Sequence, residues 1–399
     1  MSYNGVINSK YIKRRKDMLV AQFNGQLIQA NEIRLERKDK HEKRRYVWPQ
    51  CQEPVMFKHG HSRIAHFSHF SVSKCPFNEN ESQVHLEGKI RFKKEFLSMG
   101  HEAVLEHSFT QIGQRADVYI PDSQTVVEYQ CSPISFSEIK RRTRGYLSVA
   151  KRVFWILGAR YNTGIYHRDT VARFSRYHQQ LGFYFVCYSD KDQYFRLHYQ
   201  LKEVAGKIIG ETQNFLNLKT LLRFVRTSQY SSKKYQVGQN ATRRLLLHQL
   251  KMIQQSNLNR NRTYLESVTD CYSFRKLFIG CPMICHGNRG SGLPIFNKSV
   301  LCWRIWVILR LFDSNRALLS DEFLKGIFNI SYEQFGLAFA QIVDNEPFFK
   351  AEWRRLIIQL HDQGYIRHTV SGIQILKQPV WFSNYDEKRW HIMTTTQFL

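Results

Sequence analysis

The 399-residue sequence predicts a mixed α/β fold with a central core of element order α-β-β-β-α-β over residues 83–158. Two observations lead to this prediction. Apolar residues recur at helical spacing over residues 82–99, and a capping box at Ser135 precedes a second helical segment, IKRRTRGYLSVA. Four short runs of strand character lie between and after them, separated by short polar connections. Strands connected so closely are expected to pair in one sheet, with the two helices packed against it.

The first part of the chain, residues 1–80, predicts a small, turn-rich β-module. It contains the strand-like segment LVAQF and then clustered cysteines and histidines with C-x14-H-x2-H-x5-C spacing. The candidate zinc ligands in this spacing are Cys51, His66, His69 and Cys75. Two thiolates and two imidazoles suit a tetrahedral Zn²⁺ site of the structural kind. A packed β-module that binds no metal fits the sequence equally well.

The core, residues 81–165, can be assigned element by element. The first helix ends at Gly100, which suits the left-handed position after a helix. The strand segments that follow are EAVLEHSF, RADVYI and TVVEYQC. Ser135 and Glu138 form a capping box that begins the second helix. The last segment, RVFWILG, is continuously apolar and is therefore typical of a strand buried on both faces.

Residues 166–399 predict a third region that is basic and mainly helical. Strand-like segments come first, namely FYFVCY, FRLHYQL and KIIGE. Helix-like segments follow, namely RRLLLHQLKMI, WRIWVILRLF, SYEQFGLAFAQIV and FKAEWRRLIIQLHDQGYI. Residues 212–265 carry ten Lys or Arg and no Asp or Glu, with aromatic residues interleaved. We expect this segment, including Arg243 and Arg244, to add affinity for a polyanion.

The net charge of +26, from 59 Lys and Arg against 33 Asp and Glu, predicts a polyanionic partner. Nucleic acid is the first expectation and an anionic membrane surface the second. No hydrophobic run reaches the roughly eighteen residues of a membrane span, and the basic residues 13–16 lack the apolar stretch of a secretion signal. Eight cysteines are too few for a disulfide scaffold in a chain of this length. We therefore expect a cytosolic protein with reduced thiols and no membrane span.

Carboxylates interrupt two of the apolar strands. Asp117 lies in QRADVYI and Glu128 in TVVEYQ, where Gln130 shares a face with Glu128 because side chains alternate along a strand. A buried, unpaired carboxylate costs several kcal/mol or has a strongly raised pKa. A divalent cation removes this cost, and oxygen ligands from Asp117, Glu128 and the main chain of Tyr129 suit Mg²⁺ or Mn²⁺. The alternative is that both carboxylates lie at strand ends, solvated or paired with arginines.

These segments as a set resemble the competence protein CoiA family. The residues that carry the resemblance are SQVHLEGK at 82–89, QRADVYI at 114–120, VVEYQCSPIS at 126–135, KRRTRGY at 140–146 and VFWILG at 153–158. Similarity extends upstream to WPQC and HFSH and downstream to CPMICH. The resemblance implies a restriction-endonuclease-like core of the PD-(D/E)XK superfamily, with Asp117 and Glu128 as metal ligands. It also implies action on DNA, chiefly single-stranded, during natural transformation, with recombination or competence proteins as further partners.

Three further residues bear on the implied catalytic site. Gln130 stands where many members of the superfamily have Lys, and an amide orients a water or a phosphate but supplies no cation. His85 and Lys89 lie four residues apart on the first helix and share a face. Taken with the family pattern HLxGK, Lys89 is expected to supply the missing charge and His85 to contact the metal or a phosphate. Because of Gln130, and because Trp48 replaces the first Cys of a C-P-x-C knuckle, a non-cleaving DNA-binding partner is the alternative.

The second helix carries a run of basic residues directly after the implied metal strand. Its members are Lys140, Arg141, Arg142 and Arg144, followed by Tyr146. No acidic residue follows Glu138 in this helix, so contact with the DNA backbone is favoured over a solvated charged face. An RNA-binding factor also fits the charge and the aromatic residues, but the sequence lacks a recognition signature such as an RNP1 motif.

Overall fold

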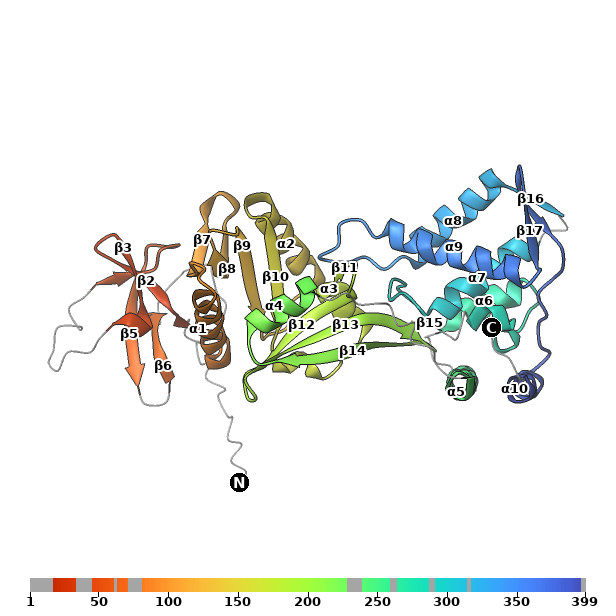
Figure 1. Ribbon diagram of the computed structural model, residues 1–399, viewed down its shortest axis with the longest axis horizontal. Helices are drawn as coiled ribbons and strands as arrows, with labels where there is room; N and C mark the ends of the chain where they lie inside the picture. Colours follow the sequence, from red (N-terminus) through yellow and green to blue (C-terminus); the bar gives the residue numbers. More distant parts are fainter. Residues whose placement is uncertain are drawn as a thin grey trace, which may run out of the picture.

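The computed structural model has an elongated shape, with a small sheet at one end, a large sheet in the middle and a group of helices at the other end (Figure 1). It describes residues 17–33, 45–60, 63–70, 81–227, 239–258, 264–286, 291–313 and 317–395. Two of the predicted features fall partly or wholly outside these residues. Cys75 lies outside them, as do residues 228–238 and 259–263 of the basic 212–265 segment.

The small sheet confirms the predicted β-character of the N-terminal module. It has six antiparallel strands in the order β1-β6-β5-β4-β2-β3. Their bounds are β1 Asp17–Met18, β2 Val20–Phe23, β3 Gln26–Gln29, β4 Tyr46–Val47, β5 Pro54–Gly60 and β6 Arg63–His69. The core of this module contains Tyr46, Trp48 and Phe67, each almost fully buried. The tryptophan at the position of the missing cysteine therefore serves packing.

The predicted order α-β-β-β-α-β is confirmed. The elements are α1 Gln83–Ser98, β7 Val104–Phe109, β8 Gln114–Ile120, β9 Thr125–Gln130, α2 Phe136–Val149 and β10 Arg152–Leu157. Each helix begins at a serine whose hydroxyl satisfies a backbone N–H that has no partner within the first turn. Ser82 accepts from the N–H of His85, and Ser135 accepts from the N–H of Glu138. Gly100 has φ of +82°, which explains the end of α1.

The large sheet contains these strands and continues beyond them in the order β14-β13-β12-β10-β9-β8-β7. β10 lies parallel to both β9 and β12, and the other pairs along this path are antiparallel. The added strands are β12 Gly182–Ser189, β13 Tyr194–Val204 and β14 Lys207–Phe215, with β11 Arg176–His178 on β12 and β15 Ser291–Gly292 on β13. The boundaries at residues 80 and 165 stay predictions, although the sheet runs on from β10 to β12 across the second of them.

Helices cover both faces of the large sheet. On one face α1 packs against β7, β8 and β9, while α4 Leu218–Thr227 packs against β13 and β14. On the other face α2 packs against β8 and β10 and is joined by α3 Arg168–Phe174. Side chains along β9 therefore alternate between the two faces of the sheet. Tyr129 belongs to the apolar core with Phe92 of α1. Val126 belongs to the core with Ile139 of α2.

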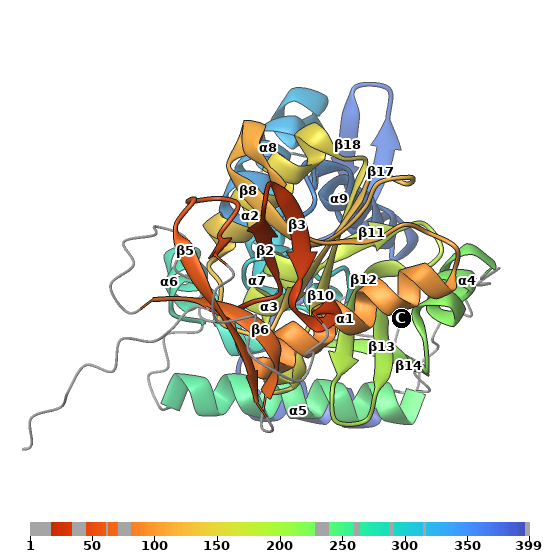
Figure 2. The same ribbon diagram turned by 90° about the vertical axis from the view of Figure 1, so that its left-hand side faces the viewer.

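The C-terminal region is mainly helical, as predicted. Its helices are α5 Gln239–Leu258, α6 Leu265–Ser273, α7 Val300–Phe312, α8 Asp321–Phe335, α9 Glu346–Asp362 and α10 Tyr385–Thr394. A small sheet of β16 Leu318–Ser320, β18 Gly372–Ile375 and β17 Ile366–Thr369 accompanies them. Figure 2 shows α5 as a long helix along one side of the molecule. None of the described helices is both long enough and apolar enough to cross a bilayer.

Two of the predicted helical segments are too long at their C-terminal ends. The helix predicted through SYEQFGLAFAQIV ends at Phe335, because Gly336 has extended backbone angles and its N–H closes the last turn on the carbonyl of Tyr332. The segment ending in DQGYI leaves the helix at Asp362, and Ile366 already belongs to β17. In each segment a glycine follows the helix and indicates where it ends. The prediction gave more weight to the apolar periodicity and therefore extended both helices too far.

Candidate functional site

The candidate site lies where the first turns of α1 meet the middle of β8. His85 and Lys89 are one helical turn apart, so both side chains point from α1 toward the sheet. The Nε2 atom of His85 lies 3.0 Å from Oδ2 of Asp117, and Nζ of Lys89 lies 3.9 Å from Oδ1 of the same carboxylate. The structure therefore brings these three predicted site residues together.

Two carboxylates that the sequence did not single out join this group. Glu81, just before the capping serine of α1, has Oε2 3.6 Å from Nδ1 of His85 and accepts a hydrogen bond from Lys89. Glu106 of β7 accepts a hydrogen bond of 2.6 Å from Nζ of Lys89. Lys89 is thus completely buried between acidic partners, which is the condition under which a protein interior tolerates a lysine charge.

A local break in the strand pattern brings Glu106 to this site. Leu105 packs in the core on the α1 side, so regular alternation would direct the next side chain toward α2. Glu106 instead has φ of +52°, a left-handed conformation that is uncommon outside glycine. Its carboxylate consequently reaches the α1 side. No alternating pattern in EAVLEHSF predicts this reversal.

The charges of the cluster shift the pKa values of its members in a consistent way. Burial alone would raise the pKa of Asp117, but His85 and Lys89 lower it far below its usual range. Burial would lower the pKa of His85, but Asp117 and Glu81 raise it. Burial would also lower the pKa of Lys89, which Glu106, Glu81 and Asp117 together raise. The carboxylate of Asp117 and the ammonium group of Lys89 are therefore ionised throughout the physiological range.

Glu128 and Gln130 of β9 make their described contacts elsewhere. Arg142 of α2 donates a hydrogen bond of 2.6 Å from Nη2 to Oε2 of Glu128. The amide nitrogen of Gln130 donates to the carbonyl of Ser132 at 2.6 Å and lies 3.2 Å from its hydroxyl. Glu128 therefore has the arginine partner that one sequence interpretation allowed. Its predicted role as a metal ligand together with Asp117 stays a prediction.

Asp117 and Glu128 nevertheless lie close in the sheet. Strand β8 pairs with β9 through Val118 opposite Val127, and Asp117 and Glu128 are the next residues in this antiparallel register. The backbone N–H of Tyr129 donates to Oδ2 of Asp117 at 2.8 Å. The two carboxylates thus belong to one cluster, held from α1 on one side and from α2 on the other.

The formal charge of the cluster is close to balanced. Its acidic members are Glu81, Glu106, Asp117 and Glu128, and its permanently basic members are Lys89, Arg115 and Arg142. The raised pKa of His85 favours its protonated form, but an imidazole that binds a metal ion must be neutral, and with His85 neutral the cluster carries one negative charge. Binding of one divalent cation together with one phosphodiester group would bring it to neutrality. The charge of the cluster is therefore compatible with a metal ion and a phosphate group.

One set of donor atoms in the cluster could hold a metal ion. One donor atom each from Glu81, His85 and Asp117 lie within 4.8 Å of one another. Two carboxylate oxygens and one imidazole nitrogen form a mixed set, and imidazole suits Mn²⁺ and later transition metals better than Mg²⁺. The predicted His85 contact with a metal is compatible with this geometry.

The predicted DNA contacts on α2 divide into exposed and internal residues. Arg141 and Arg144 are exposed and Lys140 is half-buried, with Arg141 also paired to Glu138 at 2.6 Å. Tyr146 is fully buried, and its hydroxyl donates to the carbonyl of Arg115 at 2.6 Å. The Tyr146 side chain therefore has no exposed surface for DNA, and Arg142 is directed into the cluster.

The two predicted basic contacts on α5, Arg243 and Arg244, also differ in their surroundings. Nη2 of Arg243 donates to the carbonyl of Thr395 at 2.8 Å, which joins α5 to the end of α10. Arg244 is exposed and lies on the outer side of the same helix. These positions make Arg244 the more accessible of the two for a polyanion.

The cysteine and histidine residues of the N-terminal module come together only in part. Cys51 and His69 lie close, with Sγ 3.9 Å from Nε2, and Glu53 completes a group of three donors. His66 is directed away, with Nδ1 2.8 Å from the carbonyl of Ile64. This separation follows from strand geometry, since residues three apart on β6 face opposite sides.

Comparison with known proteins adds independent evidence. A family model described as competence protein CoiA, nuclease-like domain, matches residues 81–229, and one described as competence protein CoiA, N-terminal domain, matches residues 29–78. The chain belongs to the competence protein CoiA family. A competence protein CoiA from Bacillus subtilis (strain 168) is 31% identical over 126 residues, which are 31% of this chain and 34% of that protein. The chain thus spans about a third of the length of this curated relative, and no solved structure matches it.

Proposed function

We propose that this member of the CoiA family is a metal-dependent nuclease that hydrolyses DNA phosphodiester bonds in a core of the PD-(D/E)XK type. One observation carries the proposal, namely the group of donor atoms from Glu81, His85 and Asp117 at the start of α1. The element order of the core and the match to a nuclease-like family domain support it. Action in the cytosol during natural transformation, alongside recombination or competence proteins, belongs to the same proposal.

The residues of this chain have distinct roles in the proposed mechanism. Glu81, His85 and Asp117 would hold a Mn²⁺ or Mg²⁺ ion, with Glu128 as a further ligand. When bound, the ion lowers the pKa of a coordinated water and offsets charge that builds up on the phosphate. Lys89 is completely buried, so it keeps the neighbouring carboxylates ionised and oriented and does not reach the phosphate itself.

The arginines of the cluster are better placed than Lys89 to meet a phosphate. The side chains of Arg115 and Arg142 are 17% and 11% exposed, whereas that of Lys89 has no exposure. A guanidinium group binds a phosphate oxygen in the same way as it binds a carboxylate. We therefore assign to the arginines the charge that Lys89 was expected to supply beside Gln130.

A cleavage assay tests this proposal. Single-stranded and double-stranded DNA are incubated with Mn²⁺ or with Mg²⁺, and Asp117→Ala is compared with the wild type. We expect at least about a hundredfold loss of cleavage, because changes to residues that merely support ligands already cost ten- to a hundredfold. Glu87→Ala is the control, since Glu87 is an exposed carboxylate on α1, the helix that carries His85. Full metal-dependent cleavage by Asp117→Ala would show that the assignment is wrong.

A non-cleaving DNA-binding partner is the second candidate function. The ion pair of Arg142 with Glu128 favours it, because this arginine occupies a carboxylate that metal-dependent cleavage would use. The hydrogen bonds of Gln130 to Ser132 point the same way. Tight, salt-sensitive binding of DNA without turnover under any divalent ion would select this function over hydrolysis.

We also propose a structural zinc ion in the N-terminal module, with Cys51 and His69 as its described protein ligands. A thiolate and an imidazole are the donors that Zn²⁺ prefers, and Glu53 supplies an additional oxygen. Metal analysis of the purified protein tests this proposal directly. We expect about one equivalent of zinc that Cys51→Ser loses and Cys131→Ser retains, since Cys131 is half-buried, directly follows β9 and lies outside this module. Zinc-free wild-type protein would support the packed β-module instead.

A further inference from the structure

A cavity of about 420 Å³ lies in the central part of the molecule, away from the acidic cluster. On the α1 face of the large sheet, α1 covers β7 to β9 and α4 covers β13 and β14. The cavity lies between these two helices, over β10 and β12. Its apolar wall consists of Leu221, Leu222 and Val225 from α4, with Phe154 and Tyr184 from the sheet. An apolar space of this size accommodates an organic group larger than a few waters.

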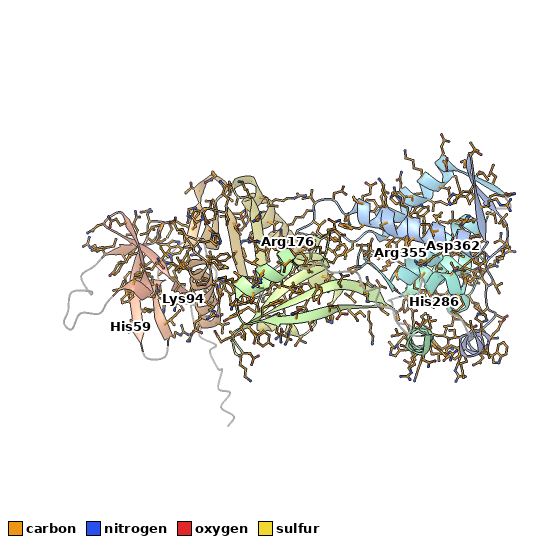
Figure 3. All side chains as sticks on the ribbon, viewed as in Figure 1. His59, Lys94, Arg176, His286, Arg355 and Asp362 are labelled. Atoms are coloured by element: carbon orange, nitrogen blue, oxygen red, sulfur yellow. The ribbon has the colours of Figure 1, made fainter. Side chains whose placement is uncertain are left out.

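The charged residues at this cavity are basic. Arg152, Arg176 and Arg226 line it, and the described lining residues include no Asp or Glu. The guanidinium of Arg176 lies over the ring of Phe154 at 4.7 Å and donates to the carbonyl of Val153 at 2.7 Å. Figure 3 labels Arg176 beside the large sheet in the middle of the molecule. Its position is therefore held by the protein itself, while Arg152 and Arg226 are exposed.

Two histidines line the cavity, His101 and His178; Nδ1 of His178 accepts from the N–H of Gln180, and His101 is paired with a carboxylate. Nδ1 of His101 lies 2.5 Å from Oδ2 of Asp122, so this pair adds little net charge. The three arginines consequently make the mouth of the cavity positive. A ligand that complements it has a flat or apolar body and a negatively charged group beside it.

We infer that this cavity binds an unstacked base of single-stranded DNA, with Arg152 and Arg226 on the adjoining phosphates. The inference rests on the proposed function and names a binding subsite for its substrate. Aromatic side chains and arginine planes are the groups on which bases of single strands stack. Phe154, with Arg176 over its ring, lines the cavity together with Tyr184 and Tyr177; Tyr177 is 45% exposed, and its ring also contacts Phe183 and Phe348.

The position of the cavity along α1 relates it to the acidic cluster. Phe96 near the end of α1 lines the cavity, whereas His85 near the start of α1 contacts Asp117. The intervening helix spans about 16 Å at 1.5 Å per residue. About five stacked nucleotides cover this length at 3.4 Å each. A strand anchored in the cavity would therefore place a phosphodiester about five nucleotides away at the cluster.

Photocrosslinking in EDTA tests the subsite without requiring cleavage. An eight-nucleotide single strand that carries 5-iodouracil at successive positions is irradiated with the full chain, and crosslinked peptides are identified by mass spectrometry. We expect crosslinks to the peptides that contain Phe154, Tyr177 or Tyr184. Crosslinks confined to other parts of the chain would overturn the inference. Displacement of the strand from these peptides by a fatty acid, but not by a thymidine nucleotide, would also overturn it.

Matched charge variants give a second readout. Arg152→Ala with Arg226→Ala removes two cavity arginines, and Arg367→Ala with Arg389→Ala removes two exposed arginines of the C-terminal region. Each phosphate contact contributes about 0.7 to the magnitude of the slope of log affinity against log salt for a single strand. Removing Arg152 and Arg226 should therefore make this slope shallower by about 1.4. Equal slopes for the two double variants would contradict the subsite.

The outcomes separate the subsite from the proposed function. Crosslinking at the cavity without any metal-dependent cleavage leaves the subsite standing and refutes the nuclease. Cleavage that Asp117→Ala abolishes, together with no crosslink at the cavity, leaves the nuclease standing and refutes the subsite.

Discussion

The carboxylate of Glu106 is one point at which the N-terminal module and the candidate site meet, and its replacement by Gln has a large expected effect. Its two oxygens accept hydrogen bonds from the backbone N–H groups of Leu19 and Val20, at 3.2 and 3.3 Å. The same carboxylate receives Nζ of Lys89 at 2.6 Å. Glu106→Gln keeps the shape of the side chain, removes its charge and leaves a single acceptor oxygen.

The magnitude follows from burial. Removing one partner of a buried ion pair costs about 3–5 kcal/mol, because the other charge stays desolvated. Lys89 has no exposed surface, but it keeps Glu81 as a partner, so we expect the lower value of about 3 kcal/mol. A tenfold change corresponds to about 1.4 kcal/mol, so backbone amides of Leu19 and Val20 should exchange with solvent about a hundredfold faster.

Hydrogen exchange measured by mass spectrometry on peptides that cover β2 and α1 is the assay. Glu138→Gln is the matched control, since Glu138 also pairs with an arginine but on an exposed helix face. Such surface pairs contribute under about 1 kcal/mol, so exchange in the control should stay at the wild-type rate. If Glu106→Gln exchanged no faster than the control, the view that this carboxylate joins the module to the site would be refuted.

The contribution of Glu106 to the unfolding free energy should depend on pH. Burial alone would raise the pKa of Glu106, but Lys89 and Arg115 lower it below its usual value in the folded state. A carboxylate with a lowered folded pKa stabilises the protein above its unfolded pKa, and this stabilisation is lost as the pH falls. Acid should therefore reduce the unfolding free energy of the wild type more than that of Glu106→Gln. Urea titrations between neutral pH and pH of about 3 measure this difference, and parallel acid losses in both proteins would contradict it.

Three further predictions concern charge and packing around the site. Arg142→Ala removes the cation beside Glu128 and should tighten binding of Mn²⁺ about tenfold or more by calorimetry, since the cluster becomes more negative; weaker binding would indicate that the arginine orders the ligands instead. Arg144→Ala should reduce the salt slope of single-stranded DNA binding by about 0.7, whereas Tyr146→Phe should leave it unchanged because that side chain is buried. Trp48→Ala, at a nearly buried position, should lower the unfolding free energy by about 3–5 kcal/mol, and a loss below about 1 kcal/mol would show that its pocket collapses readily.

Local patterns in the sequence were sufficient for much of the core. Helical periodicity, a capping box at Ser135 and short polar connections predicted α1, β7 to β10 and α2 in the correct order. The spacing of His85 and Lys89 also placed both on one face of α1, because this geometry depends only on the helical repeat. Apolar periodicity alone extended the helix beyond Phe335, where a following glycine ends it.

The composition of the charged cluster depended on tertiary structure. Glu81 lies outside any regular element, and Glu106 reaches Lys89 only because its left-handed backbone reverses the alternation of β7. Arg142 was predicted on the surface of α2 from its basic neighbours, yet packing of α2 on the sheet directs it to Glu128. A basic residue in a helix carries no local sign of which acidic residue it will meet. The sequence therefore determined which elements form and in what order, whereas the pairing of buried charges was decided by the contacts between elements, since electrostatic partners far apart in the chain are chosen by packing.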